Sequence, residues 1–199
     1  MDQQGNQVEI YAHIDESGGR LPDGRRLYGM AAVLTEETDH PLLRKRLRAL
    51  LLPGQAYLHQ HDESFERRME IVREMAELPF TGAIVVTSET TAAETERARR
   101  RLLRWLLPRL QHGERVERVV VESRAGGDKH DRRTRDHLIR SRTISSGMGV
   151  THVTKVGDEL LWLADFLVST YTTALVHDQT EQWAILEAAH VIEVVTDPG

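Results

Sequence analysis

The order of its apolar segments is the feature that most restricts what this chain can fold into. Two strand-like segments come first, at residues 8–14 and 27–34, and a turn at residues 21–24 predicts that they pair as a hairpin. Further apolar segments then alternate with stretches that have the periodicity of amphipathic helices. A hairpin followed by such alternation predicts a mixed α/β sheet covered by helices on both faces. Later strands are expected at 80–87, 116–121 and 150–156, and helices at 39–52, 62–78, 91–111, 131–142, 158–176 and 180–195, with a strand at 191–195 as the alternative for the last segment.

Length and composition exclude several classes of protein. A chain of 199 residues can bury one sizeable core but is short for two, so we expect a single domain over residues 1–199. It contains no cysteine, which excludes disulfides, zinc–thiolate sites and thiol catalysis. The polar N-terminus lacks the features of a signal peptide, and the most apolar window, residues 160–176, is short for a membrane span. These observations favour a cytoplasmic protein with no membrane partner.

Acidic residues lie at three places in the chain where packing alone does not require them. Asp15 and its neighbour Glu16 are expected at the end of the first strand, and Glu122 follows the apolar residues 119–121. Asp165 is the only charged residue between positions 160 and 176. Ligands of α/β sheets gather beyond strand ends, so these carboxylates could converge on one site. Such a cluster suits Mg²⁺ or Mn²⁺ and the hydrolysis of phosphodiesters, whereas helix caps and salt bridges remain the ordinary alternative.

Several short motifs, taken in order, resemble a bacterial family known as domain of unknown function 3800, which is considered ribonuclease H-like. The matching segments are Ile14-Asp15-Glu16-Ser17-Gly18, Leu58-His59, Val119-Val120-Val121-Glu122-Ser123-Arg124 and Leu163-Ala164-Asp165-Phe166. The resemblance covers residues 8–176 and leaves 177–199 as a C-terminal extension. It implies a ribonuclease H-like fold, with Asp15, Glu122 and Asp165 as ligands of Mg²⁺ or Mn²⁺. Two departures are Glu122, where the family more often has Asp, and Leu161, near a position that is commonly Gln.

Three further residues have open roles. In an extended strand Glu16 points away from Asp15, so it joins the site only if the chain turns at once. His59 lies in a polar loop, where it could act as a catalytic acid or metal ligand, or simply belong to a loop that caps a helix. Lys155 could neutralise phosphate charge, although an exposed lysine is the simpler expectation.

Two functions of different classes are consistent with these residues. The first is a metal-dependent nuclease acting on DNA or RNA; the second is a catalytically silent ribonuclease H-like scaffold that binds nucleic acid or a protein partner. Hydrolysis of a small phosphate ester is a third possibility. The net charge of −5 excludes a uniformly basic surface, but residues 97–109 contain six arginines and no acid. This stretch and the basic residues 124–142 could contact phosphates, or could be solvated helix faces.

The same arginine-rich stretch contains a row of leucines. Leu102, Leu103, Leu106 and Leu107 could pack in the core or form the contact of a homodimer.

Overall fold

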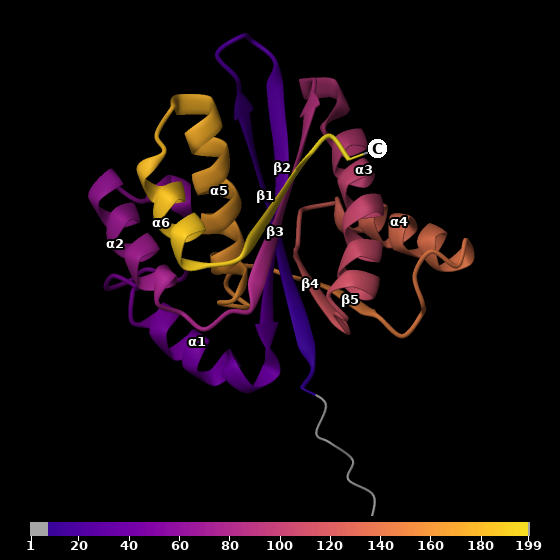
Figure 1. The fold of residues 1–199 in the computed structure, drawn as a ribbon, viewed down its shortest axis with the longest axis horizontal. Coiled ribbons are helices and arrows are strands. Elements are labelled where there is room, and N and C mark those ends of the chain that lie inside the picture. The colour runs from indigo at the N-terminus through magenta and orange to yellow at the C-terminus, as the bar shows by residue number, and fades with distance from the viewer. Residues whose placement is uncertain (1–7, 199) are drawn as a thin grey trace, which may run out of the picture.

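A six-stranded mixed sheet forms the centre of the computed structural model, which describes residues 8–198 (Figure 1). The strand order is β5-β4-β1-β2-β3-β6. The strands are β1 (Ile10–Arg20), β2 (Arg26–Glu36), β3 (Gly82–Thr90), β4 (Arg118–Glu122), β5 (Gly149–Val153) and β6 (Ile192–Thr196). The helices are α1 (His40–Arg48), α2 (Phe65–Ala76), α3 (Thr95–Pro108), α4 (Asp128–Arg140), α5 (Leu161–His177) and α6 (Glu181–Ala189). The predicted mixed α/β sheet is confirmed.

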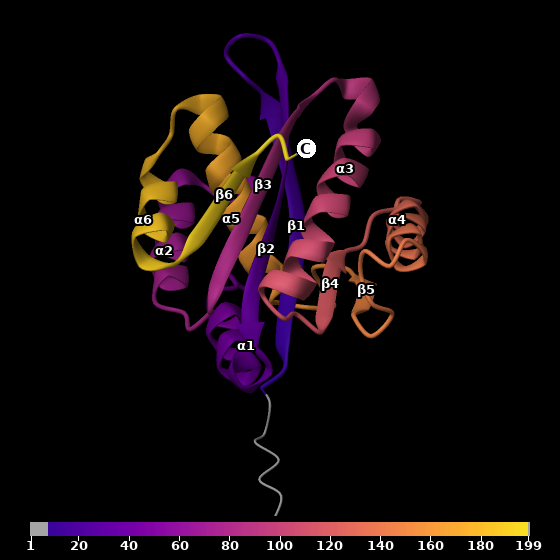
Figure 2. The same cartoon turned by 45° about the vertical axis from the view of Figure 1, so that its right-hand side comes forward.

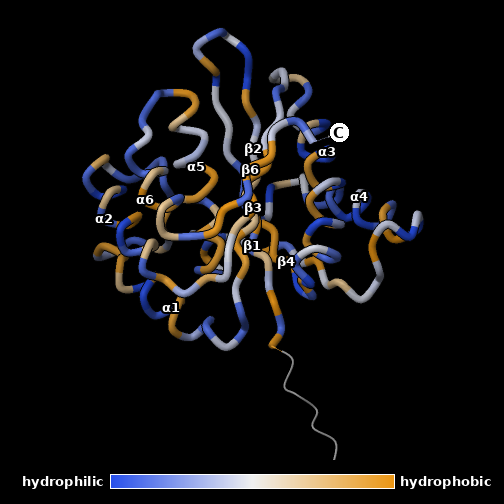
Figure 3. Tube along the Cα trace, viewed as in Figure 1, coloured by the Kyte–Doolittle hydropathy of each residue, from blue (hydrophilic) through white to orange (hydrophobic). Residues whose placement is uncertain are grey.

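Helices cover both faces of this sheet, as predicted. In Figures 1 and 2, α1, α2, α5 and α6 lie on one side of the sheet and α3 and α4 on the other. Each side has its own cluster of buried apolar side chains, and apolar residues gather along the central strands in Figure 3. The four leucines of α3 that could have formed a dimer contact are buried in the core against the sheet.

The first hairpin is longer than predicted. The expectation that the first strand ends at the acidic segment was wrong, because β1 pairs with β2 without interruption from Ile10 to Arg20. The glycines of this segment serve close packing instead of a turn. A Cβ on Gly18 would lie 2.5 Å from the carbonyl oxygen of Leu27 across the hairpin, and one on Gly19 would lie 2.9 Å from Val176 of α5. The turn itself falls at residues 21–24, as expected.

Parallel pairing positions the strands that carry the acids. β4 lies parallel to β1, and β5 lies parallel to β4, so their carboxyl ends point the same way. The tail follows the alternative given for it, since α6 is helical but residues 192–196 form β6, parallel to β3. The prediction of a continuous helix there was wrong, because the β-branched residues of this segment pair along the exposed edge of β3.

Residues 1–7, whose polarity was used against a signal peptide, lie outside the described residues. Across residues 8–198, no helix has the length and apolar character needed to cross a membrane.

Candidate functional site

Three acids that lie far apart in the sequence meet around one lysine. The ammonium nitrogen of Lys155 lies 3.0 Å from Oδ2 of Asp15, 3.5 Å from Oε1 of Glu122 and 2.8 Å from Oδ1 of Asp165. Asp15 is in the middle of β1, Glu122 is the last residue of β4, and Asp165 is in the first half of α5. The fold therefore brings together the three acids that the sequence analysis named.

Lys155 is not the exposed lysine that the sequence suggested. It is 8% exposed, and the indole N–H of Trp162 donates a hydrogen bond of 2.8 Å to its backbone carbonyl. Burial by itself lowers the pKa of this ammonium, but the charges of Asp165, Asp15 and Glu122 outweigh burial and raise the pKa well above its ordinary value. The protonated lysine thus compensates one of three negative charges.

The surroundings of Asp15 disfavour its ionised form. It is 1% exposed, and its Oδ1 accepts a hydrogen bond of 2.7 Å from the backbone N–H of Glu16. Its buried Oδ2 lies near the ammonium of Lys155 but has no hydrogen-bond donor in suitable geometry. Burial, with the adjacent Glu122 and Asp165 carboxylates, raises the pKa of Asp15 well above its ordinary range. Ionisation of Asp15 therefore adds an unfavourable negative charge to the cluster.

The pKa of Glu122 shifts in the opposite direction from that of Asp15. Burial raises its pKa, but the hydrogen bond with Asp15 and the charge of Lys155 together lower it below the ordinary value. A proton on this close pair of carboxyls therefore resides on Asp15, while Glu122 stays ionised.

A loop on the α5 side of the sheet fixes the orientation of Asp165. Its Oδ2 accepts a hydrogen bond of 2.8 Å from the backbone N–H of Gln60, while Oδ1 faces Lys155. Nε2 of His59 lies 3.7 Å from the same Oδ1, and its Nδ1 lies 3.1 Å from Asp62. His59 is thus at the rim of the cluster, with 29% of its side chain exposed.

Glu16 lies in a different cluster on the other face of the sheet. The cross-strand partner of Asp15 is Ala31, which packs with the α5 core, whereas the partner of Glu16 is Met30, which packs with the α3 core. The carboxylate of Glu16 forms an ion pair with buried Arg99 of α3. Because β1 continues through Arg20, the immediate turn that Glu16 needed in order to join Asp15 does not occur.

The remaining members of this second cluster were not singled out as site residues in the sequence. Arg99 also binds Asp131 of α4 through its Nε and Nη2, with distances of 2.7–3.2 Å. Nε2 of His152 lies 3.2 Å from Asp131, and a guanidinium nitrogen of Arg124 lies 3.6 Å from it. In the sequence, this network is indicated only by Arg99, an arginine that lies on the apolar face of the helix α3.

The donor set around Lys155 fits a divalent cation in chemistry and in charge. All three side chains offer carboxylate oxygens, which Mg²⁺ and Mn²⁺ prefer, and Oδ2 of Asp15 lacks a hydrogen-bond donor. As the side chains stand, no group of three or more His, Cys, Asp or Glu residues within 8–198 is arranged to hold an ion. The ammonium of Lys155 occupies the point on which the three carboxylates converge.

Comparisons with known proteins bear on the fold. No protein-family model and no curated protein sequence matches the chain. The resemblance to family 3800 is therefore not supported by a family match. A chain in the structure of the PCNA:RNase HII complex from Archaeoglobus fulgidus is similar over 91% of this chain and 81% of its own, with 15% identity and a TM-score of 0.50. Ribonuclease H2 from Pyrococcus horikoshii OT3 is similar over 91% and 80%, with 13% identity and a TM-score of 0.51. The chain has a ribonuclease H-like fold.

Proposed function

We propose that this protein is a divalent-metal-dependent nuclease of the ribonuclease H-like class, and a member of family 3800, that hydrolyses phosphodiester bonds of DNA or RNA. One observation carries the proposal: carboxylates from β1, β4 and α5 lie within 3.5 Å of a single buried cationic nitrogen. Three carboxylates against one ammonium leave an excess of negative charge that a divalent cation would neutralise.

The proposal gives each residue of the site a task. Asp15, Glu122 and Asp165 would hold Mg²⁺ or Mn²⁺, which supplies an activated water and neutralises phosphate charge. The backbone N–H groups of Glu16 and Gln60 fix the orientation of Asp15 and Asp165 before any substrate arrives.

Lys155 and His59 have tasks that depend on their positions. When Lys155 leaves the carboxylates, its ammonium can pair with a non-bridging phosphate oxygen. His59 is partly exposed beside Asp165 and can give a proton to the leaving oxygen. Glu16 has no task in the reaction, since its carboxylate faces Arg99 on the other side of the sheet.

A second function is favoured by the position of Lys155. Its ammonium already compensates part of the carboxylate charge, so the protein can keep its fold without a metal. That arrangement suits a catalytically silent scaffold that binds nucleic acid or a protein partner.

A cleavage assay separates the two functions. Labelled single- and double-stranded DNA and RNA are incubated with Mg²⁺, Mn²⁺ or EDTA, using the wild type, Asp15→Asn and Glu16→Gln. The nuclease proposal predicts cleavage that EDTA abolishes, that Asp15→Asn lowers by at least about 100-fold, and that Glu16→Gln retains. Cleavage that survives both EDTA and Asp15→Asn contradicts the metal site. Binding without cleavage under any of these conditions supports the scaffold.

A further inference from the structure

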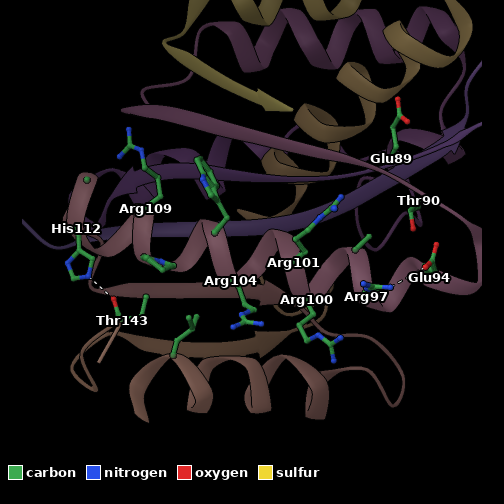
Figure 4. A pocket seen from close by; sticks show the side chains of 15 residues that line it. Glu89, Thr90, Glu94, Arg97, Arg100, Arg101, Arg104, Arg109, His112 and Thr143 are labelled. Carbon is green, nitrogen blue, oxygen red and sulfur yellow. Dashed lines mark hydrogen bonds and ion pairs between the residues drawn. The ribbon is translucent and has the colours of Figure 1, made fainter. Parts of the chain in front are cut away.

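The outer surface of α3 carries a groove that takes no part in the carboxylate site. Its volume is about 1030 Å³, and side chains along α3 line it (Figure 4). Arginines dominate its lining, at positions 97, 100, 101, 104 and 109. It lies on the α3 side of the sheet, across from α5 and Asp165.

The arginines of α3 divide into two groups. Figure 4 shows Arg101 and Arg109 on one side of the helix, and Arg100 and Arg104 on the other. On the first side acids neutralise the charge, since Arg101 lies 3.1 Å from Asp197 and Arg109 lies 2.8 Å from Glu193. On the second side Arg100 and Arg104 are exposed and have no acidic partner among the described residues. The free positive charge is therefore on the side that faces α4.

The facing surface of α4 continues this charge. An Nη of Arg104 lies 3.3 Å from Nε2 of His137, which places the two helices in contact at that point. Arg133 and Arg140 are four residues before and three after His137, so they share its face of α4. Both are exposed, and neither has an acidic partner within residues 8–198. We call the surface formed by Arg100, Arg104, Arg133, His137 and Arg140 the α3–α4 basic seam.

We infer that the α3–α4 basic seam binds the sugar–phosphate backbone of a nucleic-acid strand. This inference rests on the proposed function and adds the place where the substrate strand is held away from the site of cleavage. Guanidinium groups with no internal acid are free to form bidentate contacts with phosphate oxygens. The eight residues from Arg133 to Arg140 span about 10 Å of helix, which is long enough to meet successive phosphates.

Two observations favour a nucleic acid over an acidic protein. The two helices run alongside each other, since Arg99 contacts Asp131 and Arg104 contacts His137, so their exposed basic side chains form an extended row that suits the regularly spaced phosphates of a strand. α4 also begins six residues after Glu122, so one short loop connects the seam to a proposed metal ligand. A strand held on the seam can therefore extend toward the carboxylates.

The test compares two double variants with the same change in charge. Arg100→Glu with Arg104→Glu alters the seam, whereas Lys45→Glu with Arg73→Glu alters exposed positions of α1 and α2 across the sheet. All four positions are exposed, so both variants should fold, which thermal unfolding checks. Binding of fluorescein-labelled single-stranded DNA and RNA is measured by anisotropy in EDTA over a range of salt concentrations, so that cleavage does not compete.

We expect the seam variant to bind at least about 10-fold more weakly, with a salt slope reduced by about 1.4, since each lost phosphate contact removes about 0.7 for a single strand. The control variant should change affinity by less than about 2-fold, because its charges are screened from the seam. Equal weakening by both variants, no binding by the wild type, or displacement of the oligonucleotide by polyglutamate as readily as by unlabelled DNA would each overturn the inference.

The experiment also separates this inference from the proposed function. Asp15→Asn should bind the oligonucleotides like the wild type, because Asp15 is not part of the seam. If the seam variant loses binding while the wild type cleaves nothing, the inference stands and the nuclease proposal fails. If the wild type cleaves but the seam variant binds and cleaves normally, the nuclease proposal stands and the inference fails.

Discussion

Two consecutive residues of β1 enter two charged clusters that differ in kind. Asp15 faces α5 and joins two other carboxylates around a single lysine. Glu16 faces α3 and joins Asp131 around two arginines, Arg99 and Arg124. In the second cluster the negative charges are matched by positive ones inside the protein, whereas the first keeps an excess of negative charge.

The pKa values of the two buried aspartates reflect this difference. Burial raises the pKa of Asp15, and the neighbouring carboxylates raise it further. Burial also raises that of Asp131, but hydrogen bonds from His152 and Arg99 outweigh it and lower the pKa to about 2. A cluster that satisfies its own charges stabilises a fold, while one that leaves charge unsatisfied is prepared for a ligand.

The largest expected effect comes from breaking the balanced cluster. Arg99→Met leaves Glu16 and Asp131 without their main partner in a buried site, so we expect the free energy of unfolding to fall by about 3–5 kcal/mol. Urea denaturation measures the change. Arg100→Met is the matched control, because Arg100 is exposed and has no acidic partner among the described residues, and it should cost less than about 0.5 kcal/mol. Equal stability of the two variants would show that the second cluster is not structural.

Lys155→Met should have a smaller effect that depends on metal. Without metal, removing the ammonium leaves three carboxylates together, and we expect a loss of about 2–3 kcal/mol, less than for Arg99 because a proton on Asp15 relieves part of the repulsion. Mn²⁺ should restore most of this stability and should raise the melting temperature of the variant more than that of the wild type. Lys129→Met, at an exposed position of α4, is the control. A loss that Mn²⁺ does not reverse would favour the scaffold function.

The pH dependence of stability tests the charge state of Asp131. Its pKa of about 2 in the folded protein is below the ordinary value of 3.8, so its ionised form stabilises the fold above pH 4, and this contribution is lost as the pH falls toward 2. Asp131→Asn should therefore be roughly 2 kcal/mol less stable than the wild type at pH 6, with a difference that shrinks below pH 4. A difference that stays constant from pH 6 to pH 3 would contradict this account.

Asp15→Asn should change stability in the opposite direction, and by less. The raised pKa of Asp15 means that its ionised form destabilises the metal-free protein. This destabilisation is absent below the ordinary pKa of 3.8 and grows as the pH rises through the pKa of the folded protein. In EDTA at pH 7, the variant should be more stable than the wild type by on the order of 1 kcal/mol. A less stable variant would mean that Lys155 fully compensates the cluster.

Much of this arrangement could be predicted from local patterns. Alternating apolar and amphipathic segments indicated the mixed sheet. Acids at the end of an apolar segment, or isolated within one, indicated which carboxylates to bring together. The length of β1 could not be predicted in the same way. Gly18 and Gly19 resemble a turn locally, and only their close approach to Leu27 and Val176 shows that they belong in a strand.

The role of Lys155 was also beyond local patterns. It lies in a loop with no periodicity, and its partners are 140 residues away at Asp15 and ten residues away at Asp165. Likewise, the pairing of Glu16 with Arg99 depends on the packing of α3 against the sheet. Charge compensation is a property of the folded arrangement, so the balanced and the unbalanced cluster could not be told apart from the sequence.

Binding of Mn²⁺, measured by isothermal titration calorimetry, tests most directly whether the unbalanced cluster is a metal site. The comparison uses the wild type, Asp15→Asn and Glu16→Gln, which make the same chemical kind of change at adjacent residues on opposite faces of β1. We expect Glu16→Gln to bind Mn²⁺ like the wild type and Asp15→Asn to bind it at least about 100-fold more weakly. Equal Mn²⁺ affinity of Asp15→Asn and the wild type, or no binding by the wild type, would contradict it.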